Sequence, residues 1–173
     1  MDVWEAIWKQ RAVRSFTYRS IEPDRLERIL EAGRRAPSSK NEQRWNFVAV
    51  ADRERLQQLA RVGPYAGHLA GAAAAVALVV PDAEEGRRRE SIAFDLGQCA
   101  RNMMLAAWGM GIGSVHATVY EEGLARGLLG YPEGYSCPYL ISFGYPADPD
   151  ELSRPLAKGV RKPLGELVHR ESW

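Results

Sequence analysis

The sequence predicts a single α+β domain, and three observations support this fold class. Helical and strand-like segments alternate, but without the regular strand–helix–strand order of a doubly wound parallel sheet. One helical segment, residues 91–111, is so apolar that we expect a central helix, buried on most sides. The length of 173 residues suits one hydrophobic core, and no repeat, low-complexity segment or long linker divides residues 1–173.

Two amphipathic helices are predicted near the N-terminus. Asp2 can cap the first, over residues 3–10, because its carboxylate can accept the free N–H groups of a helix start. Pro23 begins the second, over residues 23–36, since proline fits the first helical turn. Apolar residues recur on one face of each helix: Val3, Trp4, Ile7 and Trp8 in the first, and Leu26, Ile29, Leu30 and Gly33 in the second.

Two buried strands are predicted next, over residues 45–52 and 76–80. Asp52 closes the first strand and can cap a short helix that follows it. The polar residues 82–90 are predicted to form an exposed connection to the long helix.

The long helix is predicted to begin at Ser91 and to end at a pair of glycines. Two further strands, residues 113–119 and 139–146, flank a short helix at residues 121–130. Residues 147–173 then form a Pro-rich, basic and finally amphipathic arm. The apolar face of the long helix is formed by Ile92, Leu96, Cys99, Met103 and Ala106, widened by Ala100, Met104 and Ala107.

The composition argues against several functional classes. Lys+Arg 23 against Asp+Glu 22 gives a net charge of +1, whereas dedicated nucleic-acid binders are usually basic. The longest apolar run, residues 69–81, is shorter than the roughly 20 residues that span a bilayer. The N-terminus lacks the uninterrupted apolar core of a signal peptide. We therefore expect a cytoplasmic protein with neither a nucleic-acid nor a membrane partner.

The cysteines and histidines do not predict a metal site. Cys99 and Cys137 form no close-spaced pair, and Cys99 falls in an apolar helical run where a buried small hydrophobe is expected. His68, His116 and His169 are scattered, and nothing resembles a zinc signature.

Two basic patches are candidates for phosphate binding. Arg11 and Arg14 lie three residues apart where the first predicted helix ends, and guanidinium groups offer paired donors to phosphate oxygens. The alternative is a solvated helix end, where the helix dipole favours cations. Lys158, Arg161 and Lys162 cluster in the C-terminal arm, where the alternative is a solubilising tail.

The stretch "RAPSSKNEQRWNF", residues 35–47, joins a helix to a strand and holds many polar groups. Hydroxyls of Ser38 and Ser39, with nearby backbone N–H groups, can form a small anion-binding concavity. Asn41 and Gln43 each carry a donor and an acceptor, which suits the mixed edge of a heterocycle. The alternative is a loop whose side chains bond its own backbone.

A glycine-rich stretch, "GMGIGSVHATV" at residues 109–119, leads into a strand instead of a helix. It therefore fails the dinucleotide-binding fingerprint, and its glycines are expected to end the helix or to let backbone approach a flat ligand or another chain. No G-x-S-x-G elbow, Walker lysine or Cys–His signature is present. We therefore predict no catalytic side chain, and expect a cofactor to carry the chemistry.

In order and spacing, these patches resemble the FMN-dependent nitroreductase family, of which the chain would be a short member. The matching segments are "RAVRSF", "RAPSSKNEQRWNFVAV", "DLGQCARNMMLAAWGMGIGSV", "ISFGYP" and "RKPLGELVH". The resemblance implies a mostly antiparallel sheet flanked by helices, and a homodimer that exchanges its C-terminal arms and binds two FMN molecules at its interface. It also implies an NAD(P)H-dependent flavin oxidoreductase, in which NADH or NADPH reduces the flavin and the flavin reduces nitroaromatics, quinones or related acceptors. Alternation of donor and acceptor on one open ring face predicts ping-pong kinetics.

The resemblance assigns FMN contacts by position. Arg11 and Arg14 resemble the N-terminal contacts to the phosphate and ribityl chain, and Arg161 with Lys162 resembles a C-terminal phosphate clamp. One loop resembles the segment that reaches the flavin from the partner subunit; it comprises Pro37, Ser38, Ser39 and Asn41, buttressed by Gln43 and Trp45. One strand is expected to pass near the flavin ring and offer backbone N–H groups; it contains His116, Ala117 and Thr118.

Three positions depart from the family pattern. Gln10 and Ala12 stand where a cation and a hydroxyl are usual, and Arg44 replaces a usual proline. The segment before the long helix is also too short for the flavin-covering helices of larger members. Alternative functions are cleavage of reduced flavin or dehalogenation, non-enzymatic flavin binding, and nucleic-acid binding through the basic residues 86–90 and 158–162.

Overall fold

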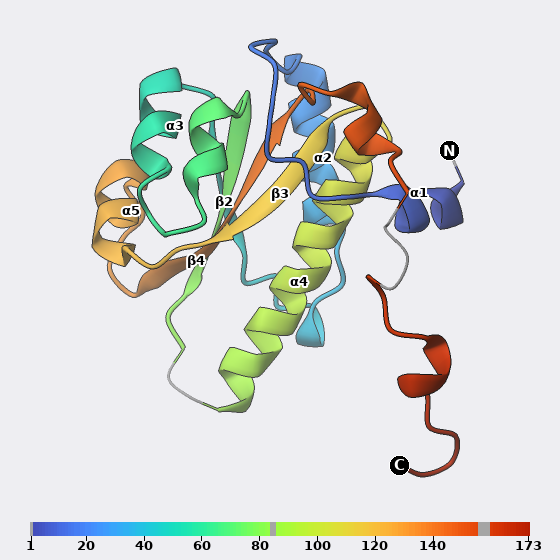
Figure 1. The fold of residues 1–173 in the computed structure, drawn as a ribbon. Helices are drawn as coiled ribbons and strands as arrows, with labels where there is room; N and C mark the ends of the chain where they lie inside the picture. The colour runs from blue at the N-terminus through green and yellow to red at the C-terminus, as the bar shows by residue number, and fades with distance from the viewer. Residues whose placement is uncertain (1, 84–85, 156–159) are drawn as a thin grey trace.

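The computed structural model describes residues 2–83, 86–155 and 160–173. Its centre is one antiparallel sheet of β1 (Asn46–Val50), β2 (Ala74–Pro81), β3 (Gly113–Thr118) and β4 (Tyr135–Gly144), in the order β1-β2-β4-β3. The α-helices of the described residues are α1 (Val3–Lys9), α2 (Pro23–Arg34), α3 (Arg53–Leu59), α4 (Arg87–Trp108) and α5 (Glu122–Leu129) (Figure 1). Short 3-10 turns occur at Ser39–Asn41, Gly67–Gly71, Pro149–Leu152 and Leu164–Glu166. The predicted α+β class is confirmed.

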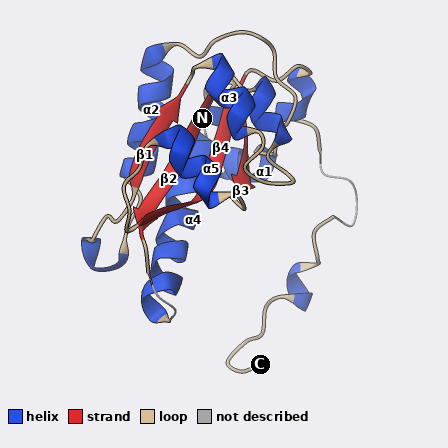
Figure 2. Ribbon diagram, turned by 90° about the vertical axis from the view of Figure 1, so that its left-hand side faces the viewer, coloured by secondary structure: helices blue, strands red, loops and turns tan. Residues whose placement is uncertain are grey.

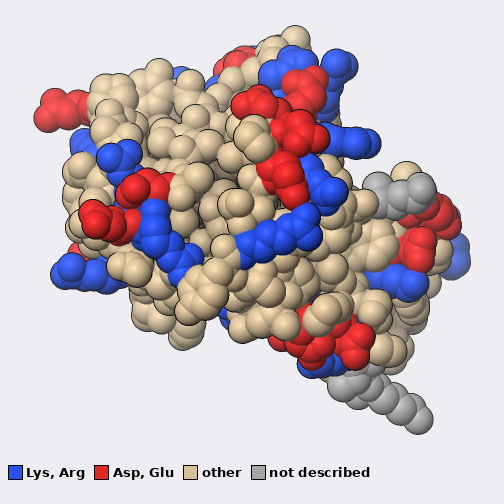
Figure 3. All heavy atoms as spheres, turned by 90° about the horizontal axis from the view of Figure 1, so that it is seen from above, with Lys and Arg blue, Asp and Glu red and all other residues tan. Residues whose placement is uncertain are grey.

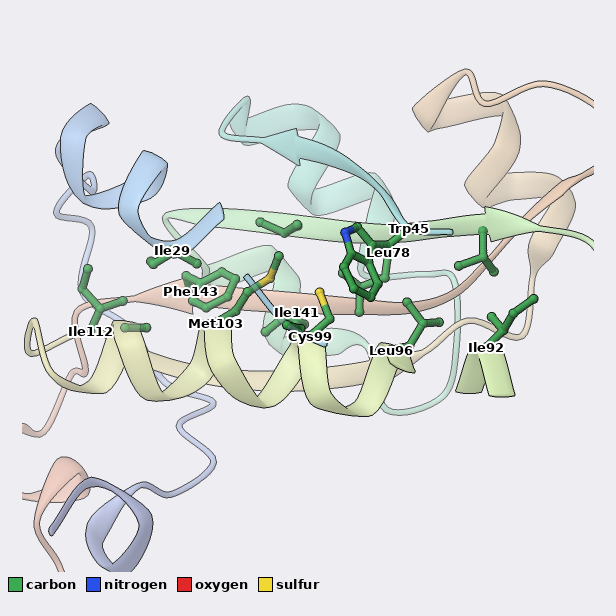
Figure 4. Close-up of a cluster of buried hydrophobic side chains, with 14 residues drawn as sticks. Ile29, Trp45, Leu78, Ile92, Leu96, Cys99, Met103, Ile112, Ile141 and Phe143 are labelled. Carbon is green, nitrogen blue, oxygen red and sulfur yellow. The ribbon is translucent and has the colours of Figure 1, made fainter. Parts of the chain in front are cut away.

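Helices cover both faces of the sheet (Figure 2). In β2, Val76, Leu78 and Val80 pack in one cluster with α2 and α4, while the residues between them pack in a second cluster with α3 and α5. Because both faces are buried, β2 is apolar at every position, as in strands enclosed between helices. Figure 4 shows the first cluster, in which Cys99 and Met103 of α4 point toward the sheet.

The cysteine prediction is confirmed. Cys99 is fully buried, and burial raises the pKa of its thiol to about 12. Cys137 is also fully buried, and burial, then the nearby Glu122 carboxylate, raise the pKa of its thiol to about 12. Both thiols are therefore protonated and unreactive at neutral pH.

The predicted caps are confirmed, but the start of the long helix was predicted wrongly. Asp2 accepts a hydrogen bond from Trp4 N at 3.0 Å, and Asp52 accepts one from Arg55 N at 2.8 Å. α4 begins at Arg87 instead of Ser91, so part of the expected connection is helical. Residues 87–90 are exposed, and their Arg and Glu side chains are good helix formers that show no apolar periodicity.

Within one chain, α4 is buried on one side only, and this corrects the prediction of a helix buried on most sides. Ile92, Leu96 and Cys99 face the core. On the opposite side Ala93 and Gly97 are exposed, and Phe94 is 71% exposed. Phe94 and its exposed neighbours Ala93 and Gly97 form an apolar surface on this side of α4.

The N-terminal basic segment lies against the edge strand β3. Val13 N donates to Ser114 O at 3.1 Å, and Ala12 pairs with Ser114 in a parallel bridge. A Cβ added at Gly113 would lie 2.6 Å from the Cβ of Val13. At Gly113 the absence of a side chain therefore lets the chain's own N-terminal segment come close, in place of the expected flat ligand or second chain.

Two apolar segments are left uncovered by the residues that the structure describes. The predicted apolar face of α1 is exposed, with Trp4 at 66% and Trp8 at 67% exposure. The arm residues 160–173 extend away from the body (Figures 1 and 2), and Trp173 is 100% exposed. No helix in the described ranges is long and apolar enough to cross a membrane.

Candidate functional site

Three adjoining hollows follow the open side of α4 and form a groove. The first is lined by Pro37, Ser38 and Ser39 together with the N-terminal half of α4. The second shares Pro37 with the first and extends to Arg101. The third, of about 300 Å³, shares Arg101 and reaches β3 and β4 at His116 and Tyr139. The structure thus brings the predicted loop and the predicted strand to opposite ends of one groove.

The loop after α2 is held in an unusual backbone conformation. Lys40, Asn41 and Gln43 have φ values of 53°, 56° and 47°, in the left-handed region that non-glycine residues seldom adopt. Such conformations persist only where the surroundings enforce them, and they concentrate at functional sites. Ser39 N donates to both carboxylate oxygens of Asp95 at 3.1 Å, and Asp95 is buried in α4. A charged anchor on the long helix therefore fixes the loop.

Two of the predicted polar side chains bond within the loop. Ser38 Oγ accepts a hydrogen bond from Gln43 N at 3.0 Å, and Gln43 Nε2 donates to Asn41 O at 3.3 Å. The alternative of self-bonded side chains thus describes Ser38 and Gln43. Ser39 and Asn41 are exposed, so their side-chain groups are accessible to a ligand.

Arg44, which stands where the family usually has proline, connects the loop to α4. Its guanidinium forms an ion pair with Glu42 and donates to Ser91 Oγ at 3.5 Å. The Arg44 side chain is only 13% exposed. Proline could make neither contact, so Arg44 provides a second attachment of the loop beside Asp95.

Arg11 and Arg14 point to different surroundings. Arg11 Nη1 donates to Trp8 O at 2.6 Å and to Gln10 O at 2.9 Å, at the end of α1. Arg14 is exposed and lines a separate hollow with His68 and His116. Because His116 also lines the groove, it connects the two hollows.

The predicted residues of β3 differ in accessibility. His116 and Thr118 are exposed, whereas Ala117 is buried in the cluster with α3 and α5. At Ala117 the side chain is therefore hidden in the core, and a ligand in the groove could reach only the backbone of this residue. β3 is an edge strand, which leaves alternate backbone N–H groups unpaired within the sheet.

The predicted C-terminal clamp is not brought to the groove within one chain. Arg161 and Lys162 are exposed on the arm that extends from the body, and Lys158 lies outside the described residues.

Sequence reasoning missed four residues of the site. Asp95 and Arg101 are ionic residues within the apolar long helix, and that mismatch is a signal the sequence carries. Tyr139 begins the apolar run of β4 and lies edge-on to His116, with ring centroids 6.4 Å apart. His68 approaches Ser142 Oγ at 2.8 Å and carries no local sequence signal.

Comparisons with known proteins identify the family. A sequence profile of the nitroreductase family matches residues 7–70 and 63–145. A protein of Archaeoglobus fulgidus named "Putative NADH dehydrogenase/NAD(P)H nitroreductase" is 33% identical over 171 residues, and the match covers 96% of each chain. An NADPH-flavin oxidoreductase of Vibrio harveyi is 28% identical over 182 residues, covering 98% of this chain and 73% of that protein.

A solved structure agrees with the sequence matches. The crystal structure described as a "putative nitroreductase in complex with fmn" from Desulfovibrio desulfuricans has a TM-score of 0.80 and 27% identity, and the match covers 100% of this chain and 98% of that one. The chain therefore belongs to the nitroreductase family, and the resemblance drawn from its sequence patches is confirmed.

Proposed function

We propose that the protein is an FMN-dependent oxidoreductase that takes electrons from NADH or NADPH. The observation that carries the proposal is the groove along α4, which has the fixed polar loop at one end and His116 with Tyr139 at the other. The names of the Archaeoglobus and Vibrio relatives support the donor, and the FMN complex of the Desulfovibrio relative supports the cofactor. We place the reaction in the cytoplasm, where both donors are available.

The residues around the groove fit the chemistry of FMN. Arg11 Nε is buried without a hydrogen-bond partner, so a donor is left for an anionic ligand. We assign Arg11 and Arg14 to the phosphate and ribityl chain. Arg161 and Lys162 would complete the phosphate contacts from the partner subunit. When bound, FMN supplies the redox chemistry, so no catalytic side chain is required.

The ring would be met by groups from two directions. The exposed loop positions Pro37, Ser39 and Asn41, with Ser38 and Gln43 fixing their conformation, would approach it from the partner subunit. The contacts from the other direction would come from the edge strand, through the backbone of His116, Ala117 and Thr118. Backbone N–H groups near the ring favour the reduced, negatively charged flavin.

We propose a homodimer with its flavin sites at the interface. The uncovered α1 face, the exposed Phe94 on α4 and the extended arm are apolar surfaces that a second copy would bury. A two-fold axis would place each arm against the other subunit and supply identical contacts twice. Arg161 and Lys162 would then reach the partner's groove.

A ping-pong reaction follows from the proposed site. The donor binds at the open ring face, leaves, and is replaced by a nitroaromatic, quinone or related acceptor. The family defines the fold and the cofactor but does not choose the acceptor.

On the face shown in Figure 3 acidic and basic side chains are interspersed, so that face offers no continuous basic surface to a nucleic acid.

Anaerobic spectroscopy tests the proposal. The purified protein is expected to be yellow, to be bleached by NADH or NADPH, and to regain its colour when a quinone or nitroaromatic is added. Steady-state rates at several acceptor concentrations should give parallel double-reciprocal lines. Colourless protein that takes up no FMN would overturn the proposal. Yellow protein that neither donor bleaches would favour the alternative of a flavin-binding protein without reductase activity.

A further inference from the structure

Two arginines meet beside Gln10 without a carboxylate partner. Arg101 of α4 donates through Nη1 to Gln10 Oε1, and Arg11 follows Gln10 in the chain. Arg101 is part-buried, and burial, followed by the charge of Arg11, lowers its pKa. Neither guanidinium forms an ion pair with any residue that the structure describes.

Among the described arginines that form no ion pair, Arg11 and Arg101 are part-buried and the others are exposed. Arg19, Arg34, Arg44 and Arg154 each contact a carboxylate oxygen. Arg11 and Arg101 both donate to Gln10, to its backbone and side-chain oxygens respectively, and the buried Nε of Arg11 has no hydrogen-bond acceptor in the described structure. Like charges that lose solvent without a counter-ion destabilise the fold, and an anion bound between them would remove that cost.

The position of Arg101 places such an anion at the groove. Arg101 is shared by the hollow next to Pro37 and the hollow next to His116, so it lies at the middle of the groove wall. Beside it, Gly97 is exposed, and a Cβ added there would meet no atom within 4 Å, which leaves open space above the helix. The side chain of Gln10 is uncharged, but its amide oxygen accepts the hydrogen bond that orients the guanidinium group of Arg101.

We propose that Arg101, oriented by Gln10, forms with Arg11 a binding site for a phosphate monoester dianion. Paired guanidinium groups match the geometry and charge of such an anion. The identity of the ligand rests on the proposed function, under which the dianion is the phosphate of FMN. α4 would thus supply the cation that is missing at position 10 of the N-terminal segment.

Flavin titrations of the apo-protein test the site. Riboflavin lacks only the phosphate, so Arg101→Gln should raise the Kd of FMN about 10- to 100-fold and leave that of riboflavin within about twofold. Arg101→Lys keeps the positive charge but lacks the paired N–H donors of a guanidinium group. It should therefore recover part of the FMN affinity that Arg101→Gln loses. Arg89→Gln removes an exposed arginine from the same helix, and should change neither Kd. An equal loss for both flavins would identify Arg101 as a merely structural residue.

Inorganic phosphate separates this inference from the proposed function. Phosphate should raise the Tm of wild-type apo-protein above that in chloride at equal ionic strength, and Arg101→Gln should lose the increase. If no flavin binds but this phosphate effect is found, the anion site stands and the proposed function fails. If phosphate leaves the Tm of the wild-type apo-protein unchanged, and the ratio of the Kd of FMN to that of riboflavin is the same in Arg101→Gln as in wild type, the inference fails.

Two further controls keep the test decisive. A rise in KM for NADPH but not NADH in the FMN-loaded Arg101→Gln enzyme, with unchanged FMN affinity, would assign the site to the 2′-phosphate of the donor and overturn its assignment to FMN. If Arg101→Gln fails to fold, Arg101→Lys and Gln10→Ala are compared in the same titrations. Both should then lose FMN affinity and retain riboflavin affinity, and unchanged FMN binding in both would sink the inference.

Discussion

His68 is kept neutral by its surroundings. Its Nδ1 lies 2.8 Å from Ser142 Oγ, and its Nε2 is buried without a hydrogen-bond partner. Burial lowers its pKa to about 4, and the positive charge of Arg14, then His116, add to the shift. A protonated His68 would lose solvent and lie close to the cation of Arg14, and the hydrogen bond that the His116 backbone offers offsets only part of this cost.

Acid should therefore destabilise the protein through His68. The unfolded histidine takes up a proton near pH 6.5 and the folded one near pH 4, so the unfolded state binds more protons between these values. The contribution to stability is complete above pH 6.5 and is lost progressively as the pH drops toward 4. Urea unfolding at several pH values should show a flatter pH profile for His68→Gln than for wild type.

His169→Gln serves as the control for this profile, because His169 is exposed on the extended arm. Two carboxylates also contribute to the loss of stability in acid, because hydrogen bonds lower their pKa values to about 2: Glu22, mainly through Tyr145, and Glu31, mainly through Arg34. Both are present in every variant, so they affect all the pH profiles equally. Parallel pH profiles for wild type and His68→Gln would contradict the assignment.

At the scale of elements, the core was predictable and the anchoring of the loop was not. The apolar run of β2 and the periodic face of α4 reveal their burial because each pattern is local. The left-handed residues of the loop follow from the contact of Ser39 with Asp95, which lies 56 positions away in sequence and cannot be read from a local pattern. The exposed side of α4 was missed because apolar residues look alike whether they face a core or a second chain.

Removing the anchor should loosen the loop. Asp95→Ala leaves Ser39 N without its charged acceptor, and we expect a loss of about 1 to 3 kcal/mol in the free energy of unfolding. Trypsin should then cleave faster after Lys40, whose left-handed backbone is no longer enforced. Urea unfolding and timed proteolysis measure the two effects.

Glu90→Ala is the matched control, because Glu90 is an exposed carboxylate on the same helix. Its stability should stay within about 0.5 kcal/mol of wild type. If Asp95→Ala is as stable as wild type and trypsin cleaves it no faster, the loop is fixed by other contacts.

At the scale of the whole molecule, the C-terminal arm is separate from the body of the fold. Residues 160–173 contribute to neither hydrophobic core cluster, and their backbone hydrogen bonds in the described structure are local to the arm. The sequence indicated an arm from its composition, and in the proposed dimer the arm would pack against a second chain. The arm carries both apolar residues for an interface and two of the proposed phosphate contacts.

A chain that ends at residue 155 should retain the fold and lose assembly. Far-UV circular dichroism and cooperative unfolding are expected to persist, because the core does not use the arm. Light scattering should show a monomer, and FMN should be lost on gel filtration. Tyr18→Ser, which alters an exposed aromatic residue outside these surfaces, should leave mass and FMN content unchanged. A truncated dimer that keeps its FMN would refute this role of the arm.

The strand order has a consequence for biosynthesis. Among the strands of the sheet, β3 pairs with β4 and β4 also pairs with β2, so the sheet cannot be completed until residue 144 has left the ribosome. Until then the nascent chain carries β2, which is apolar along its whole length, with one edge unpaired and its faces incompletely covered. Such a segment is prone to intermolecular pairing, so the growing chain is a natural client for chaperones that bind extended apolar peptides during translation.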